Sequence, residues 1–143
     1  VPCWLGASPE WIRLACDRGL PLVIHTREAD DDTIDVLTRE GRGKARGVFH
    51  CFSGNQAMAD FALERNFRIS FSGSLTFKNA GSLRQIAPTI PEHALLTETD
   101  APFLSPHPHR GKRNEPVRVM EVVHCLAELR HERLVLRGQR RRS

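Results

Sequence analysis

Short apolar runs alternate with helical patterns along this chain, and the alternation constrains its fold more than any other feature. The runs recur at intervals of about 25 residues, enough for a strand, its turns and a crossover helix. Strands are expected at 20–25, 46–50, 67–71 and 94–98. The first of them is apolar at almost every position, which is typical of a strand buried on both faces in a parallel sheet. The sequence therefore predicts an α/β fold built from βαβ units.

Start and stop signals delimit the helices between these strands. Ser8, Pro9 and Glu10 are typical of a helix N-terminus, and Gly19 is placed to end that helix. A second helix is predicted to begin at the aspartates of residues 30–32 and to end at Gly41. The other helices are expected at 55–66, immediately before Pro88, and from Pro116 onward.

Two architectures are compatible with four such units, an open doubly wound sheet and part of a (β/α)₈ barrel. Neither a G-x-G-x-x-G nor a G-x-x-x-x-G-K-[ST] motif follows any predicted strand, so the usual nucleotide-binding signatures are absent. Polar residues gather instead after the carboxyl ends of successive strands, where a barrel carries its chemistry. A complete barrel takes roughly 250 residues, and four strands make half of one.

The distribution of charge matters more than the net value of +4. Residues 130–143 hold six arginines against one glutamate, a balance of +5, so residues 1–129 carry −1. The nearly neutral body gives no general reason to expect nucleic-acid binding. We expect residues 131–143 to form a disordered Arg-rich tail that follows a domain over residues 1–130.

Compartment and redox state follow from what the sequence lacks. No apolar run reaches the roughly 18 residues that a membrane span needs, and no signal-peptide pattern opens the sequence. We therefore expect a cytoplasmic protein without a membrane partner. The four cysteines are scattered and form no C-x-x-C pair, which favours reduced thiols.

Two histidines and one aspartate follow predicted strands at similar positions. His25 and His50 end the first two strands, and Asp100 lies just beyond the fourth. Because parallel strands present their carboxyl ends at one edge, these side chains are expected at a common rim. Imidazole and carboxylate groups are ligands of Zn²⁺, Mn²⁺ and similar divalent ions. A single histidine at a strand end is more often a hydrogen-bonded structural residue, and spacing alone leaves both interpretations open.

Other charged residues are placed to reach the same rim. Glu98 is two residues before Asp100, so on an extended strand both side chains face the same way. Arg27, two residues after His25, is a candidate phosphate-binding residue or a partner of a nearby acid. In the loop before Pro116, Arg110 and Lys112 are candidate phosphate-binding residues, and a solvated basic loop is the alternative.

These residues lie in segments that resemble the TatD family of metal-dependent deoxyribonucleases, within the amidohydrolase-like TIM barrels. The segments are PLVIHTREA (21–29), GVFHCFSG (47–54), ISFSGSLTFKNA (69–80) and LLTETDAPFLSPHPHRGKRNEP (95–116). The resemblance spans residues 20 to about 129. It implies that the chain forms strands five to eight, the C-terminal half of a TIM barrel. It also implies that His25, His50 and Asp100 are metal ligands, and that Asp100 orients or deprotonates the attacking water.

The cofactors and the substrate are likewise implied by the resemblance. Family members use divalent metal ions (Mg²⁺, Mn²⁺ or Zn²⁺), two in a full-length enzyme, and cleave DNA, in general as exonucleases. They also carry an H-x-H motif on strand one and a glutamate on a middle strand, and neither precedes His25 here. We therefore expect weak or absent activity from this chain alone. The alternatives are a barrel hydrolase of lactones, esters or amides, and an inactive half-barrel that pairs with another chain.

Overall fold

The computed structural model describes residues 9–132, and its strands form one parallel sheet. The strands are β1 (Leu22–Ile24), β2 (Gly47–Phe49), β3 (Arg68–Phe71) and β4 (Leu95–Thr97). Each pairs in parallel with the next, in the order β1-β2-β3-β4. A doubly wound sheet reverses its strand order at a switch point, whereas consecutive order is that of a barrel segment. The sheet order therefore decides between the two predicted architectures in favour of the barrel segment.

The predicted helices are present with small changes at their ends. They are α1 (Pro9–Arg18), α2 (Asp30–Gly41), α3 (Gln56–Glu64), α4 (Gly81–Ile86) and α5 (Val119–Leu129). Short 3₁₀ turns lie at η1 (Gly73–Thr76), η2 (Ala87–Thr89), η3 (Glu92–Ala94) and η4 (Pro116–Arg118). The 3₁₀ turn η1 lies in the connection between β3 and α4. Asn55 caps α3, since its side chain accepts the backbone N–H of Met58 at 2.9 Å.

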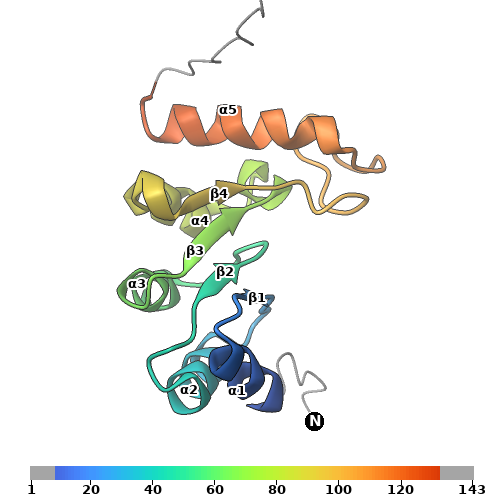
Figure 1. The fold of residues 1–143 in the computed structure, drawn as a ribbon. Coiled ribbons are helices and arrows are strands. Elements are labelled where there is room, and N and C mark those ends of the chain that lie inside the picture. The colour runs from blue at the N-terminus through green and yellow to red at the C-terminus, as the bar shows by residue number, and fades with distance from the viewer. Residues whose placement is uncertain (1–8, 133–143) are drawn as a thin grey trace, which may run out of the picture.

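One face of the sheet carries the hydrophobic core. Ile24, Phe49 and Ile69 are buried and occupy facing positions in the register of adjacent strands. The helices cover these residues with their own apolar side chains, among them Leu37, Met58, Ala62, Leu83, Ile86, Val122 and Leu126. Figure 1 shows the strands stacked in chain order, with α1 and α2 beyond β1 and with α5 beyond β4.

The opposite face of the sheet is partly open, which corrects the prediction that the first strand is buried on both faces. Val23 is 74% exposed and Leu96 is 38% exposed. Their partners in the register, Val48 and Ser70, lie on the same face. In a closed barrel this face lines the interior, where side chains from strands across the barrel cover it. No such strands are present among residues 9–132, so the apolar side chains stay exposed.

The structure also bears on the predictions about membrane spans, cysteines and the C-terminal tail. No helix in the described part of the chain is long and apolar enough to cross a membrane. Cys16, Cys51 and Cys125 are free thiols. Most of the predicted Arg-rich tail lies outside the described residues.

Candidate metal centre

The three predicted ligands lie at the carboxyl end of the sheet. His25 and His50 directly follow β1 and β2, and Asp100 lies just beyond β4. The two imidazole rings are 5.7 Å apart between centroids. The Nε2 atom of His50 lies 3.5 Å from Oδ1 of Asp100. Residues that are 75 positions apart in the chain therefore share one rim of the sheet.

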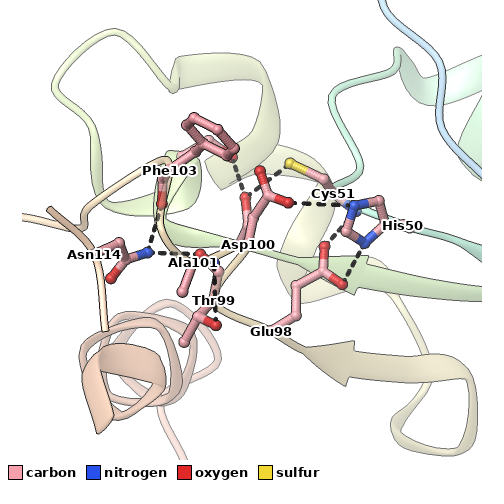
Figure 2. Close-up of polar contacts among 10 residues, drawn as sticks. His50, Cys51, Glu98, Thr99, Asp100, Ala101, Phe103 and Asn114 are labelled. Carbon is pink, nitrogen blue, oxygen red and sulfur yellow. Dashed lines mark hydrogen bonds and ion pairs between the residues drawn. The ribbon is translucent and has the colours of Figure 1, made fainter. Parts of the chain in front are cut away.

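Glu98 orients the His50 ring from the opposite side (Figure 2). Its Oε2 lies 2.7 Å from Nδ1 of His50, and its Oε1 accepts the backbone N–H of Cys51. The Glu98 backbone N–H donates to the carbonyl of Phe71 at 2.9 Å, which ties this residue to β3. A carboxylate at Nδ1 fixes the proton on that nitrogen and directs the lone pair of Nε2 toward Asp100. The sequence indicated that Glu98 points to the rim, and the structure adds its contact with His50.

The donor atoms at this rim fit a divalent metal ion. Two ligands bound to one ion at about 2.1 Å lie about 3 to 3.5 Å apart, which matches His50 Nε2 and Asp100 Oδ1. A histidine held by a carboxylate at its other nitrogen is the usual arrangement around bound metal. Within residues 9–132, however, no three His, Cys, Asp or Glu side chains form a closed set of ligands. The described rim therefore holds two donor atoms at a spacing that suits one metal ion, without a full set of ligands.

The turn that carries Asp100 is held by Asn114, a residue that sequence analysis did not single out. Asn114 is 3% exposed, and its side-chain amide donates to the carbonyls of Thr99 and Phe103, each at 2.7 Å. Its backbone N–H donates to the carbonyl of Pro102 at 3.0 Å. The Phe103 N–H closes the turn on the Asp100 carbonyl at 2.9 Å (Figure 2). A lone asparagine in a basic loop gives no sequence signal for this role, because the two carbonyls that accept from its side-chain amide lie 11 and 15 residues earlier.

The Cys51 thiol takes no part in the rim, although the backbone N–H of this residue donates to Glu98. The Cys51 side chain is buried, and Sγ contacts the Ser72 hydroxyl at 3.1 Å. Burial raises the pKa of the Cys51 thiol, while the hydrogen bond with Ser72 opposes the shift. Burial and the raised pKa therefore disfavour a reactive thiolate at this position.

No described contact joins the three predicted phosphate-binding residues to one another. The Arg27 side chain is 83% exposed and lies 4.0 Å from its neighbour Glu28. Lys112 is exposed, and its backbone N–H donates to the His109 carbonyl. Arg110 lies over the ring of Phe77, with its guanidinium carbon 3.7 Å from the centroid. Of the three cations, Arg110 alone has a described contact with a loop that follows another strand.

A comparison with protein families matches most of this sequence to one family. The family described as TatD related DNase matches residues 9–135 of this sequence. The chain belongs to that family. The match begins before the first resembling segment and continues five residues into the predicted tail.

Individual relatives of this TatD-family chain agree with the match. The metal-dependent hydrolase YabD of Bacillus subtilis, described as uncharacterized, is 45% identical over 119 residues, covering 83% of this chain and 47% of that protein. A protein of Pectobacterium carotovorum named 3'-5' ssDNA/RNA exonuclease TatD is 34% identical over 133 residues, covering 90% of this chain and 51% of that protein. The crystal structure of YjjV, a TatD homologue from Escherichia coli, is 31% identical with a TM-score of 0.78, covering 87% of this chain and 48% of that chain.

The match covers only part of each relative. This chain spans about half the length of the relatives it matches, at 47% and 46% for two of them. A four-stranded sheet with consecutive order has the same proportion to an eight-stranded barrel. The incomplete ligand set and the exposed sheet face of residues 9–132 are consistent with a chain that matches about half of each relative.

Proposed function

We propose that this chain carries the catalytic rim of a metal-dependent hydrolase that cleaves phosphodiester bonds in DNA, in general as an exonuclease. We further propose that it corresponds to strands five to eight, the C-terminal half of a TIM barrel. The observation that carries the proposal is the convergence of His25, His50 and Asp100 at one rim, in a chain of the TatD related DNase family. The exonuclease name of one relative supports the nuclease activity.

Each rim residue has a role that follows from its contacts. His25, His50 and Asp100 would hold the metal ion, and Glu98 keeps His50 in the tautomer that offers Nε2. A bound divalent ion (Mg²⁺, Mn²⁺ or Zn²⁺) supplies charge for the phosphoryl oxygens and acidifies water. The Asp100 carboxylate accepts the proton of the water that attacks phosphorus. Arg110, in the loop that follows β4, is a candidate for binding phosphate of the substrate strand.

A second state of the chain is favoured by the exposed sheet face. Val23 and Leu96 lie on the surface that a complete barrel buries, and β1 and β4 each have a free edge within residues 9–132. We propose that the chain is inactive or nearly inactive until a complementary half-barrel covers this face. The part of the Bacillus subtilis relative that lies outside the matched region is the natural test partner, since this chain matches 47% of that protein.

The deciding experiment measures nucleotide release from a single-stranded DNA oligonucleotide. The 143-residue chain is assayed with Mn²⁺, Mg²⁺ or Zn²⁺, alone and after mixing with the complementary half of the relative. We expect little release from the chain alone, metal-dependent release from the mixture, and none after Asp100→Asn. Undiminished release with Asp100→Asn would refute the assignment. A panel of lactones and amides in the same mixture tests the alternative hydrolase activity.

A further inference from the structure

A pocket of about 390 Å³ lies between the loop that follows β3 and the loop that follows β4. Both loops leave the carboxyl end of the sheet, where His50 and Asp100 are found. The lining residues are Thr76, Phe77, Lys78, Asn79, His107 and Arg110. This set contains two cations, a histidine, an amide and a hydroxyl, but no carboxylate. A concave surface of this composition favours an anion, above all one that accepts several hydrogen bonds.

Direct contacts hold the two loops together. A Cβ atom at Gly73 would lie 1.9 Å from the carbonyl oxygen of Leu104, so the loops touch where a side chain would separate them. Thr76 Oγ1 accepts the backbone N–H of His107 at 2.8 Å and donates to the Gly73 carbonyl at 2.7 Å. A ligand therefore meets a preformed pocket and does not have to order it.

Phe77 holds the main cation of the pocket in a defined orientation. The Arg110 guanidinium carbon is 3.7 Å from the centre of the Phe77 ring, and the Phe77 side chain packs against the hydrophobic core. A guanidinium stacked on a ring directs its N–H groups sideways, in the plane of the group. Planar N–H groups in a fixed direction suit the oxygens of a phosphate.

We infer that this pocket binds a non-scissile backbone phosphate of a nucleic-acid strand, through Arg110 and Lys78, with Phe77 as the residue that positions Arg110. The inference rests on the proposed function, because a phosphodiester at the metal-centre rim brings neighbouring phosphates of the same strand toward these loops. It also narrows that function. A lactone or an amide has no phosphate for the pocket, and a ligand with a single phosphate cannot occupy the rim and the pocket together.

The test measures binding of a labelled single-stranded hexanucleotide by fluorescence anisotropy, with EDTA present and at several salt concentrations. Each phosphate contact contributes about 0.7 to the slope of log affinity against log salt. We expect Lys78→Ala and Arg110→Ala each to lower the affinity about tenfold and to reduce the slope by about 0.7. Thermal unfolding of both variants should match that of the unchanged chain, because both side chains lie at the surface.

The positioning role of Phe77 needs a separate readout. Phe77→Leu keeps an apolar side chain against the core and should lower affinity about threefold without changing the salt slope. In the Arg110→Ala background the same substitution should cause no further loss, because the residue acts through Arg110. An equal loss in both backgrounds would show that Phe77 has only a structural role.

The chain offers matched controls on its other surfaces. Phe61 lies on α3 and Arg65 directly follows this helix. The guanidinium carbon of Arg65 is 5.4 Å from the centre of the Phe61 ring. Arg65→Ala and Phe61→Leu repeat the chemical changes at that second arginine–phenylalanine stack. Lys44→Ala removes an exposed lysine from the turn before β2, at the amino end of the sheet. All three controls should leave both affinity and salt slope unchanged.

The outcomes separate this inference from the proposed function. Oligonucleotide binding that depends on Lys78 and Arg110, without cleavage when metal and the complementary half are added, supports the pocket and rejects the hydrolase. Cleavage together with unchanged salt slopes in both variants rejects the pocket and retains the hydrolase. Absence of oligonucleotide binding overturns the inference, as does competition by inorganic phosphate or a mononucleotide at the affinity of the hexanucleotide.

Discussion

The His50 imidazole lies between two carboxylates, with Glu98 at Nδ1 and Asp100 at Nε2. Only the contact with Glu98 is short, at 2.7 Å, and that carboxylate also accepts the N–H of Cys51. Glu98 therefore sets the direction of the ring, and Asp100 shares the side that faces a ligand. Both glutamate oxygens meet N–H donors, so the charge and the two acceptors of a carboxylate are used in full.

Glu98→Gln should weaken metal binding without removing a ligand. The glutamine amide offers one acceptor to two N–H donors, so the His50 ring loses its fixed tautomer or its orientation. We expect the affinity for Zn²⁺, measured by isothermal titration calorimetry, to fall by about 10- to 100-fold. Glu92→Gln, at an exposed position in η3, is the control. Unchanged Zn²⁺ affinity in Glu98→Gln would show that Glu98 does not support the site.

Asn114→Leu should destabilise the Asp100 turn. The leucine removes two donors and leaves the Thr99 and Phe103 carbonyls without this partner in a partly buried setting. We expect a loss of about 3 kcal/mol in the free energy of unfolding, measured by urea denaturation. Gln85→Leu, at an exposed position of α4, should change it by less than about 0.5 kcal/mol. Equal stability of the two variants would contradict the role given to Asn114.

At the scale of elements, close backbone contacts and charged pairs fix how neighbouring units pack. β1 and β2 approach closely at Gly47, which pairs with Leu22 in the register and has a φ of 157°. Helices α1 and α2 are joined by Glu40, whose carboxylate lies 3.0 Å from Arg13 and 2.9 Å from Arg39. The first contact tolerates no side chain, and the second depends on charge.

Gly47→Ala should disrupt the pairing of β1 with β2. A Cβ atom there would lie 1.9 Å from the carbonyl oxygen of Leu22, and backbone has to move to relieve that contact. We expect a loss of more than about 3 kcal/mol in unfolding free energy. Gly81→Ala is the matched control, since no atom lies within 4 Å of its added Cβ. At the first residue of α4 it should be neutral or stabilise the fold by up to about 1 kcal/mol.

The contribution of Glu40 should depend on pH. The hydrogen bond from Arg39 lowers the pKa of the Glu40 carboxyl below its ordinary value of 4.5, and the charge of Arg13 acts in the same direction. A carboxyl with a lowered pKa in the folded chain stabilises the fold above its unfolded pKa and loses this effect as pH falls through the lowered value. We therefore expect the chain to be more stable than Glu40→Gln at pH 7, with the difference shrinking below about pH 4.5.

Urea denaturation of both proteins between pH 7 and pH 3 measures this difference. Glu64→Gln, at an exposed position of α3, serves as the control and should show no such pH dependence relative to the unchanged chain. A stability difference for Glu40→Gln that stays constant over the whole pH range would contradict the assignment.

For the whole molecule, the open sheet face is the feature with the largest consequence. Val23 and Leu96 expose apolar surface on a face that continues toward the metal-centre rim, and the sheet has two free edges within residues 9–132. Exposed strand edges next to apolar surface promote association. The same surface that would receive a complementary half-barrel is therefore expected to make the chain self-associate when it is alone.

Replacing both residues with lysine should reduce this association. We expect the unchanged chain to elute with a mass above that of the 16.2 kDa monomer in size-exclusion chromatography with light scattering, and the Val23→Lys/Leu96→Lys variant to shift toward the monomer. The same variant should lose activation by the complementary half. Val117→Lys, a 70% exposed position in η4, should change neither property. A monomeric unchanged chain would contradict the prediction.

Local sequence patterns were sufficient to predict the helices and strands and the positions at which the strands end. Capping residues, glycines and apolar runs act over a few positions, so α2, α3 and the four strands lie within a few residues of their predicted bounds. The same locality placed His25 and His50 directly after strands, and parallel pairing then required them to share a rim. The predicted roles of Arg27 and Lys112 in phosphate binding remain predictions.

Contacts between distant residues decided the rest. Strand order depends on pairing between distant segments. The same is true of three contacts between residues many positions apart: Glu98 with His50, Asn114 with the Thr99 carbonyl, and Arg110 with the ring of Phe77. Burial of β1 was mispredicted for a related reason. An apolar strand pattern reports the preference of the strand for a covered face, while the cover has to come from other strands, which residues 9–132 do not contain.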